Sequence, residues 1–148
     1  MSRLRKFLGL SNTQRCCLVE AWFWLAVARL AILILPFRGI APFLGRQMAL
    51  SAEESGFAPT ELLDHVSWAV ATVARHLPWD CTCLAQALAG KAMLRVRGVP
   101  STLYLGLAKT GEVQLQAHAW LRCGERILTG WQEKGRFTVI ATFAEDEQ

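Results

Sequence analysis

The longest apolar stretch of the chain, residues 16–35, predicts a single helix. It follows a basic and polar segment, residues 1–15, and it ends at Pro36, which a helix interior does not tolerate. Its length is just enough to cross a bilayer. Glu20 and Arg29 lie inside it, however, and charges at membrane depth are costly. We therefore expect a buried or partner-docking helix, with contact to a membrane surface as the alternative.

Two further helices are predicted after an irregular segment, residues 36–58, that is rich in proline and glycine. The first, Glu61–Leu77, carries apolar side chains at helical spacing. The second follows Asp80, its N-cap, and runs to about Arg97, with Gly98 as its C-terminal stop. Each of these helices would present one apolar face to a shared core.

From residue 101 onward the apolar period changes from that of a helix to that of a strand. Turn residues divide this part of the chain into four predicted strands: Ser101–Ala108, Val113–Leu121, Glu125–Thr129 and Phe137–Phe143. Helices followed by an antiparallel sheet indicate an α+β fold. We expect residues 1–58 to form a basic segment, an apolar helix and a linker, and residues 59–148 to form the α+β core, as one compact unit.

The composition fits a globular protein of one domain. Hydrophobic residues make up 53% of the 148 positions and charged residues 19%, which excludes a disordered chain. The net charge of +4 is a small excess. It indicates weak attraction to acidic peptides or anionic lipid, with a solvated basic tail as the alternative, and it does not indicate a nucleic-acid partner.

The five cysteines do not form a pattern typical of secreted disulfide frameworks. Their number is odd, Cys16 and Cys17 are adjacent, and Cys81 and Cys83 are separated by one residue. This favours a reducing cytoplasm. The spacing matches no zinc motif, so we expect no metal and no other certain cofactor. A nucleotide requirement is left open by the sequence.

A cysteine and a histidine are the candidate catalytic pair. With Asp80 as the cap, Cys83 falls in the first turn of its helix, where free N–H groups and the helix dipole stabilise a thiolate or an oxyanion. His118 lies mid-strand in Ala-His-Ala-Trp and could take the thiol proton. Cys81 is less well placed. The alternatives are a buried structural thiol and a structural histidine.

A third group should orient the imidazole, as in Cys-His-Asp or Cys-His-Asn sites. The next strand contains no carboxylate between Arg126 and Gly130. Thr129 is therefore the candidate on that strand. Glu125, Glu133 and Asp80 are the other candidates.

Four segments together resemble the B-protein leader peptidases of lasso-peptide biosynthesis, which belong to the transglutaminase-like cysteine protease superfamily. They are residues 83–89, 94–100, 103–106 and 117–121. The resemblance covers roughly residues 60–143 and implies a transglutaminase-like, papain-like core with Cys83 as nucleophile and His118 as general base. Many members carry an aspartate about a dozen residues after the histidine, and this chain has Gly130 there.

The resemblance also implies partners and a pathway. They are a precursor peptide whose leader is removed, a separate leader-recognition protein, and an asparagine-synthetase-like cyclase that closes the ring afterwards. Two alternatives remain for the function. One is acyl transfer to an amine on the same scaffold, and the other is a non-catalytic scaffold protein whose residues 16–35 dock partners.

Overall fold

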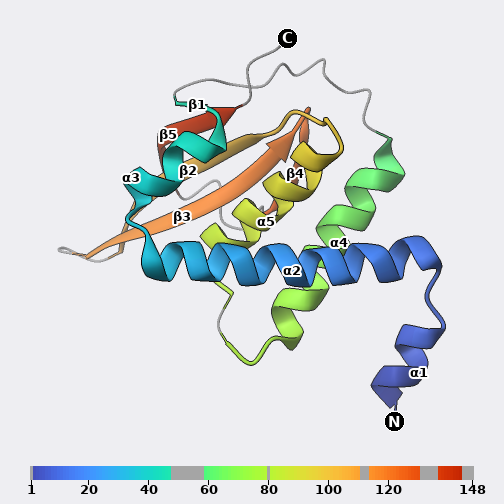
Figure 1. The fold of residues 1–148 in the computed structure, drawn as a ribbon. Helices are drawn as coiled ribbons and strands as arrows, with labels where there is room; N and C mark the ends of the chain where they lie inside the picture. The colour runs from blue at the N-terminus through green and yellow to red at the C-terminus, as the bar shows by residue number, and fades with distance from the viewer. Residues whose placement is uncertain (1, 48–58, 80, 111–113, 131–136, 145–148) are drawn as a thin grey trace.

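The helices of this protein gather on one side of an antiparallel sheet (Figure 1). The computed structural model describes residues 2–47, 59–79, 81–110, 114–130 and 137–144. The helices are α1 (Ser2–Leu8), α2 (Asn12–Ile34), α3 (Phe37–Ile40), the 3-10 turn η1 (Ala41–Leu44), α4 (Thr60–His76) and α5 (Cys83–Val96). The strands are β1 (Arg46–Gln47), β2 (Thr102–Thr110), β3 (Gln114–Cys123), β4 (Arg126–Thr129) and β5 (Thr138–Ala144). The expected α+β order is confirmed.

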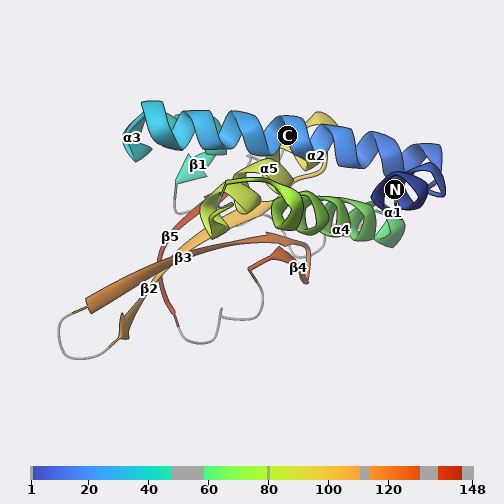
Figure 2. The same cartoon turned by 90° about the horizontal axis from the view of Figure 1, so that it is seen from below.

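The five strands lie in the order β1-β5-β2-β3-β4, and every neighbouring pair is antiparallel. Seen from below, α2, α4 and α5 lie on one side of this sheet, and none of the described helices lies on the other side (Figure 2). α5 packs directly on the sheet, while α2 lies across α4 and α5 and is the farthest of these three helices from the strands. The core is thus enclosed between the sheet and the helix layer.

α2 begins four residues before the apolar run because polar residues cap its first turn. The Ser11 side chain accepts a hydrogen bond from the Gln14 backbone N–H at 3.2 Å, and the Gln14 side chain accepts one from the Ser11 N–H at 3.0 Å. This reciprocal capping box satisfies two N–H groups that the helix leaves free. The helix ends at Ile34 because Leu35, the residue before Pro36, adopts an extended conformation.

α5 begins two residues later than predicted. Its N-cap is Thr82, whose hydroxyl accepts a hydrogen bond from the Ala85 backbone N–H at 3.2 Å. Cys83 is therefore the first residue of the helix and not the third. Asp80, the predicted cap, lies outside the described residues. The prediction was wrong because both Asp80 and Thr82 are residue types that suit an N-cap, and the sequence pattern does not choose between them.

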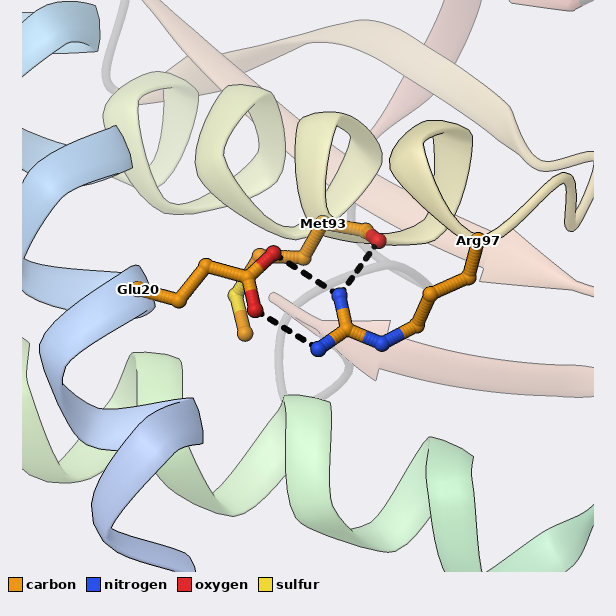
Figure 3. A network of polar contacts seen from close by, with 3 residues as sticks. All are labelled: Glu20, Met93 and Arg97. Atoms are coloured by element: carbon orange, nitrogen blue, oxygen red, sulfur yellow. Dashed lines mark hydrogen bonds and ion pairs between the residues drawn. The ribbon is translucent and has the colours of Figure 1, made fainter. Parts of the chain in front are cut away.

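Two sets of polar contacts hold α5 to its neighbours. The Arg97 guanidinium donates to both carboxylate oxygens of Glu20, at 2.8 and 2.6 Å, and to the Met93 carbonyl at 2.8 Å (Figure 3). The hydrogen bond to Glu20 raises the pKa of Arg97 and outweighs the effect of partial burial. In α5, the buried Lys91 ammonium donates to the Ser101 carbonyl at 2.7 Å. These contacts tie α2 to the end of α5, and α5 to the start of β2.

The central strands present two different faces. On the helix side, buried apolar residues such as Leu103, Leu121 and Phe143 join the main core. On the other side, aromatic rings gather: Tyr104 stacks on Trp120, with centroids 5.3 Å apart and an interplanar angle of 5°. Strict alternation along β3 therefore separates core residues from a second, aromatic surface.

The sequence did not predict α1 or β1. β1 has two residues, in the segment that we expected to be irregular, and it pairs with the end of β5 through Arg46 and Gln47. A strand of two residues is too short to show an alternating pattern. Its position depends on the strand with which it pairs. α1 lies in the segment that we read only as basic and polar.

Candidate active site

Cys83 occupies the N-terminal end of α5. It is half-buried and packs against the hydrophobic core. The first backbone N–H groups of a helix have no carbonyl partner within the helix. In α5, the N–H of Ala85 donates to the hydroxyl of the cap residue Thr82 instead. The first turn of α5 contains no acidic residue. A negative charge on the Cys83 sulfur, or on an oxyanion beside it, would thus meet N–H groups and the positive end of the helix dipole.

His118 is held from several sides on β3. Its Nε2 atom lies 3.0 Å from the carbonyl oxygen of Gly130. Its ring stacks on Phe137 with centroids 4.9 Å apart, and on Trp120 with centroids 6.0 Å apart. A carbonyl oxygen only accepts hydrogen bonds, so Nε2 carries the proton in this contact. In the neutral ring, the lone pair that can accept a proton is then on Nδ1.

Two glycines make room for this ring cluster. A Cβ atom on Gly106, the residue opposite His118 on β2, would lie 2.7 Å from the Phe137 Cβ and 2.9 Å from the Trp120 ring. A Cβ atom on Gly130 would lie 3.0 Å from His118 Nε2, and Gly130 has a φ of +72°. The sequence analysis missed Gly106 and Phe137 as neighbours of the histidine. A glycine within the strand next to an Ala-His-Ala motif was the available signal.

Thr129 does not contact the imidazole in the way that we expected. It pairs with Leu121 across β3 and β4, and its methyl group faces Gly90 of α5. Its hydroxyl is buried and has no hydrogen-bond partner among the described residues. His118 instead donates to the backbone carbonyl of the next residue, Gly130. The side chain of Thr129 therefore points toward the helix layer and not toward the ring.

The remaining candidates for a third group do not change this result. Glu125 is exposed in the turn between β3 and β4. Glu133 and Asp80 lie outside the described residues.

Cys81, the rival nucleophile, precedes the helix, and its carbonyl accepts a hydrogen bond from the Gln86 side chain at 3.0 Å. Within the described ranges, no group of three His, Cys, Asp or Glu side chains could hold a metal ion.

Cys83 on α5 and His118 on β3 lie at the same end of the contact between these two elements. A Cβ atom on Gly90 would lie 2.9 Å from the Leu121 side chain, so α5 and β3 are in close contact there. Cys83 precedes Gly90 by two turns of helix, about 10 Å. His118 precedes Leu121 by three strand residues, also about 10 Å. Because α5 and β3 run in the same direction (Figure 1), the two distances lead to the same end of the contact.

The two side chains start from different faces of the sheet. Ala119 and Leu121 belong to the core under α5, whereas His118 faces the side of Trp120 and Phe137. Within the described part of the chain, no hydrogen bond joins the Cys83 sulfur to the imidazole. β4 pairs with β3 only from Leu121 onward. β4 therefore does not cover the edge of β3 beside His118. The ring leans toward this edge, where it meets Gly130.

A helix that begins at a cysteine, beside a strand that carries a histidine, is the arrangement used by cysteine-dependent hydrolases and acyltransferases. The comparisons agree with this class. Residues 26–142, well over half of the chain, match the family model of the transglutaminase-like superfamily. The chain belongs to that superfamily, and its α+β fold is a transglutaminase-like domain. This membership suggests cysteine protease or acyltransferase activity. Searches of curated proteins and of solved structures found no match.

Proposed function

We propose that this protein is a cysteine peptidase that removes the leader from a ribosomally synthesised lasso-peptide precursor. One observation carries the proposal. α5 begins at Cys83, at the level of a histidine whose Nε2 donates to the Gly130 carbonyl, so that the basic lone pair of the neutral ring is on Nδ1. The superfamily supplies the reaction class. The resemblance of the Cys83 and His118 segments to lasso leader peptidases supplies the substrate.

The reaction would proceed in two acyl-transfer steps. His118 Nδ1 takes the thiol proton, and the Cys83 sulfur bonds to the carbonyl carbon at the leader–core junction. The C–N bond then breaks, and the proton on Nδ1 moves to the departing amine of the core peptide. Water attacks the carbonyl carbon of the resulting thioester and gives one proton to Nδ1. The C–S bond then breaks, the leader leaves with a free carboxylate, and the proton on Nδ1 returns to the Cys83 sulfur. N–H groups in the first turn of α5 would stabilise the oxyanion in both steps.

The proposal requires the thiol and the ring to meet at the edge of β3 that β4 does not cover. The Cys83 side chain would have to turn toward this edge from the helix side of the sheet, and the imidazole already contacts Gly130 there. Catalytic hydrogen bonds are often long in the absence of substrate and shorten when substrate binds. We therefore propose that a bound leader peptide completes the pair.

The Gly130 carbonyl takes the place of the aspartate that many relatives of this type carry. It accepts the Nε2 proton and fixes the tautomer, as a carboxylate would. Being neutral, it stabilises the imidazolium less than a carboxylate does. A lower rate than that of carboxylate-containing enzymes follows from this difference.

The same proposal includes the partners. A separate leader-recognition protein would present the precursor to Cys83, and an asparagine-synthetase-like cyclase would act on the released core. We propose that the reaction takes place in the cytoplasm and uses no cofactor of this chain's own.

The test is cleavage of the precursor, with the recognition protein present, by wild-type protein and by two matched variants. Cys83→Ala should lower the rate at least about 1,000-fold, because the nucleophile is removed. Cys81→Ala should retain most of the rate, because Cys81 lies outside the helix. Cleavage by Cys83→Ala at the wild-type rate would reject the nucleophile assignment, and wild-type rates in both variants would favour a scaffold role for this chain. Loss of cleavage only in Cys81→Ala would move the assignment to that residue.

Mass spectrometry of the leader product separates hydrolysis from acyl transfer. Hydrolysis leaves a leader with a free carboxylate, heavier than the acyl fragment by one water. Transfer to an added primary amine leaves a leader that carries that amine. We expect the hydrolysed product even when an amine is present.

A further inference from the structure

α2 is apolar on two opposite sides. Its inner side contributes Cys17, Ala21, Leu25 and Ala28 to the core, all at most 5% exposed. Its outer side carries seven large apolar side chains that are 39–73% exposed, and we call them the outer stripe: Val19, Trp22, Phe23, Val27, Leu30, Leu33 and Ile34. At 100° per residue the two sets lie about 180° apart on the helix. A soluble helix normally exposes polar residues there, so the outer stripe calls for a covering surface.

The charge around the outer stripe is almost entirely positive. Residues 1–50 contain seven Lys or Arg and one Glu, a net charge of +6, whereas residues 51–148 carry nine basic and eleven acidic residues, a net charge of −2. The single acidic residue, Glu20, is occupied by the Arg97 guanidinium (Figure 3). On α1, Arg3, Arg5 and Lys6 are all exposed. The apolar surface is therefore paired with a net positive charge.

An apolar cavity continues the outer stripe toward α1. It has a volume of about 940 Å³, lies between α1, α2 and α4, and shares Val19 and Trp22 with the stripe. Phe7 and Trp68 line it as well, and Arg3 and Lys6 are also among its lining residues. Apolar walls with cationic groups suit an acyl chain whose headgroup is anionic.

We infer that α1 and the outer stripe of α2 form a docking surface for an anionic lipid bilayer. Apolar side chains would enter the boundary between headgroups and acyl chains, and the basic residues of α1 would contact anionic headgroups. α2 is long and apolar enough to span a membrane by length and composition alone. Its inner side, however, is part of the core, with Ala21 and Leu25 fully buried. α2 would therefore lie in the plane of the interface and not across it.

This orientation keeps the sheet away from the membrane. α2 lies on the helix side of the sheet, beyond α4 and α5 (Figure 2), so the sheet face that carries His118 would point toward water. A soluble precursor could then reach the edge of β3 that β4 does not cover while α2 stays docked.

Co-sedimentation with lipid vesicles tests the docking surface without any activity assay. We expect the wild-type chain to sediment with vesicles of phosphatidylcholine and phosphatidylglycerol in equal parts, and to bind pure phosphatidylcholine at least about tenfold more weakly. Added salt should weaken the binding to anionic vesicles, because the contact of α1 with headgroups is exposed to solvent.

Two matched triple variants locate the surface. Leu30→Gln/Leu33→Gln/Ile34→Gln removes three exposed side chains of the outer stripe and should reduce vesicle binding at least about tenfold. Leu115→Gln/Val139→Gln/Ile140→Gln removes three exposed apolar side chains from β3 and β5 and should leave binding unchanged. All six positions are at least 45% exposed, so both variants should fold, which circular dichroism can check.

Several results would overturn the inference. Wild-type protein that stays in solution with anionic vesicles would do so, as would equal binding by wild type and the outer-stripe variant. Equal affinity for anionic and neutral vesicles would remove the role of charge. A lipid-free dimer that the outer-stripe variant breaks, detected by light scattering, would show that a second copy covers the stripe instead.

Discussion

At the residue scale, the orientation of the His118 ring depends on a backbone group rather than on another side chain. Nε2 donates to the Gly130 carbonyl, and Gly130 adopts a φ of +72° that side-chain-bearing residues rarely adopt. The conformation of one glycine thus sets both the position and the tautomer of the proposed base. Two substitutions on β4 and just after it separate this contact from the role first expected for Thr129.

Gly130→Ala should disturb both folding and catalysis. The new Cβ would lie 2.7 Å from the Ala119 carbonyl oxygen and 3.0 Å from His118 Nε2, in addition to the cost of a positive φ. We expect a loss of about 2–3 kcal/mol in the free energy of unfolding, measured with urea. Precursor cleavage should fall at least about tenfold under conditions in which the variant is folded.

Gly98→Ala is the matched control for that substitution. Gly98 also has a positive φ, +70°, but a Cβ atom there meets nothing within 4 Å. It should lose only about 1 kcal/mol and keep its activity. If the two variants behave alike in stability and activity, the contact between Gly130 and His118 does not position the ring.

Thr129→Val should be tolerated. The Thr129 hydroxyl is buried and has no hydrogen-bond partner among the described residues, so replacing it by a methyl group removes an unfavourable burial. We expect the free energy of unfolding to stay the same or rise by about 1 kcal/mol, and the cleavage rate to remain within about twofold. A loss of cleavage as large as that of His118→Ala would restore Thr129 as the third catalytic residue.

At the element scale, α2 is fixed to α5 by the contact between Glu20 and Arg97. Both side chains are largely shielded from water, with 24% and 27% of their surfaces exposed. Next to them, burial is the main cause that raises the pKa of the Cys17 thiol, and the Arg97 charge partly opposes it. This end of the helix layer is therefore drier than the surface, and charge pairs in such places are sensitive to loss of one partner.

Glu20→Gln should destabilise the protein by about 1–2 kcal/mol, because it leaves the Arg97 guanidinium half-buried without a counter-charge. Asp64→Asn is the matched control, since Asp64 pairs with Arg126 at side chains that are 56% and 39% exposed. An exposed pair of this kind contributes less than about 1 kcal/mol. Urea unfolding of both variants measures the difference. An equal loss in the two variants would contradict the view that α2 is tied to α5 by this pair.

Periodicity predicted the long elements well, and local contacts explain where it failed. α4 was expected at Glu61–Leu77 and lies at Thr60–His76, because its apolar face repeats over four turns. The first residue of α5 was wrong, since the choice of Thr82 as cap is made by the three-dimensional course of the loop. The Gly130 carbonyl could not be predicted at all, because every residue carries a backbone carbonyl and sequence patterns do not distinguish one from another.

At the scale of the whole molecule, the chain has two surfaces with different properties. The outer stripe and α1 are apolar and basic, while the other surface holds the aromatic rings around His118. The α+β class followed from the order of helical and strand periods, and the superfamily match agrees with it. Contact between the Cys83 thiol and the His118 imidazole stays a prediction from the sequence, because it depends on which face of β3 each side chain reaches.

The rate at which Cys83 is alkylated by iodoacetamide near neutral pH tests the proposed pair most directly. Peptide mass spectrometry resolves the five free cysteines, and exposed Cys16 serves as an internal reference. The account predicts that Cys83 reacts several-fold faster than Cys16, although it is half-buried, and that His118→Ala removes this excess while Cys16 is unchanged. A Cys83 rate that is the same in wild type and His118→Ala would contradict the account, because the thiol would then act without the imidazole.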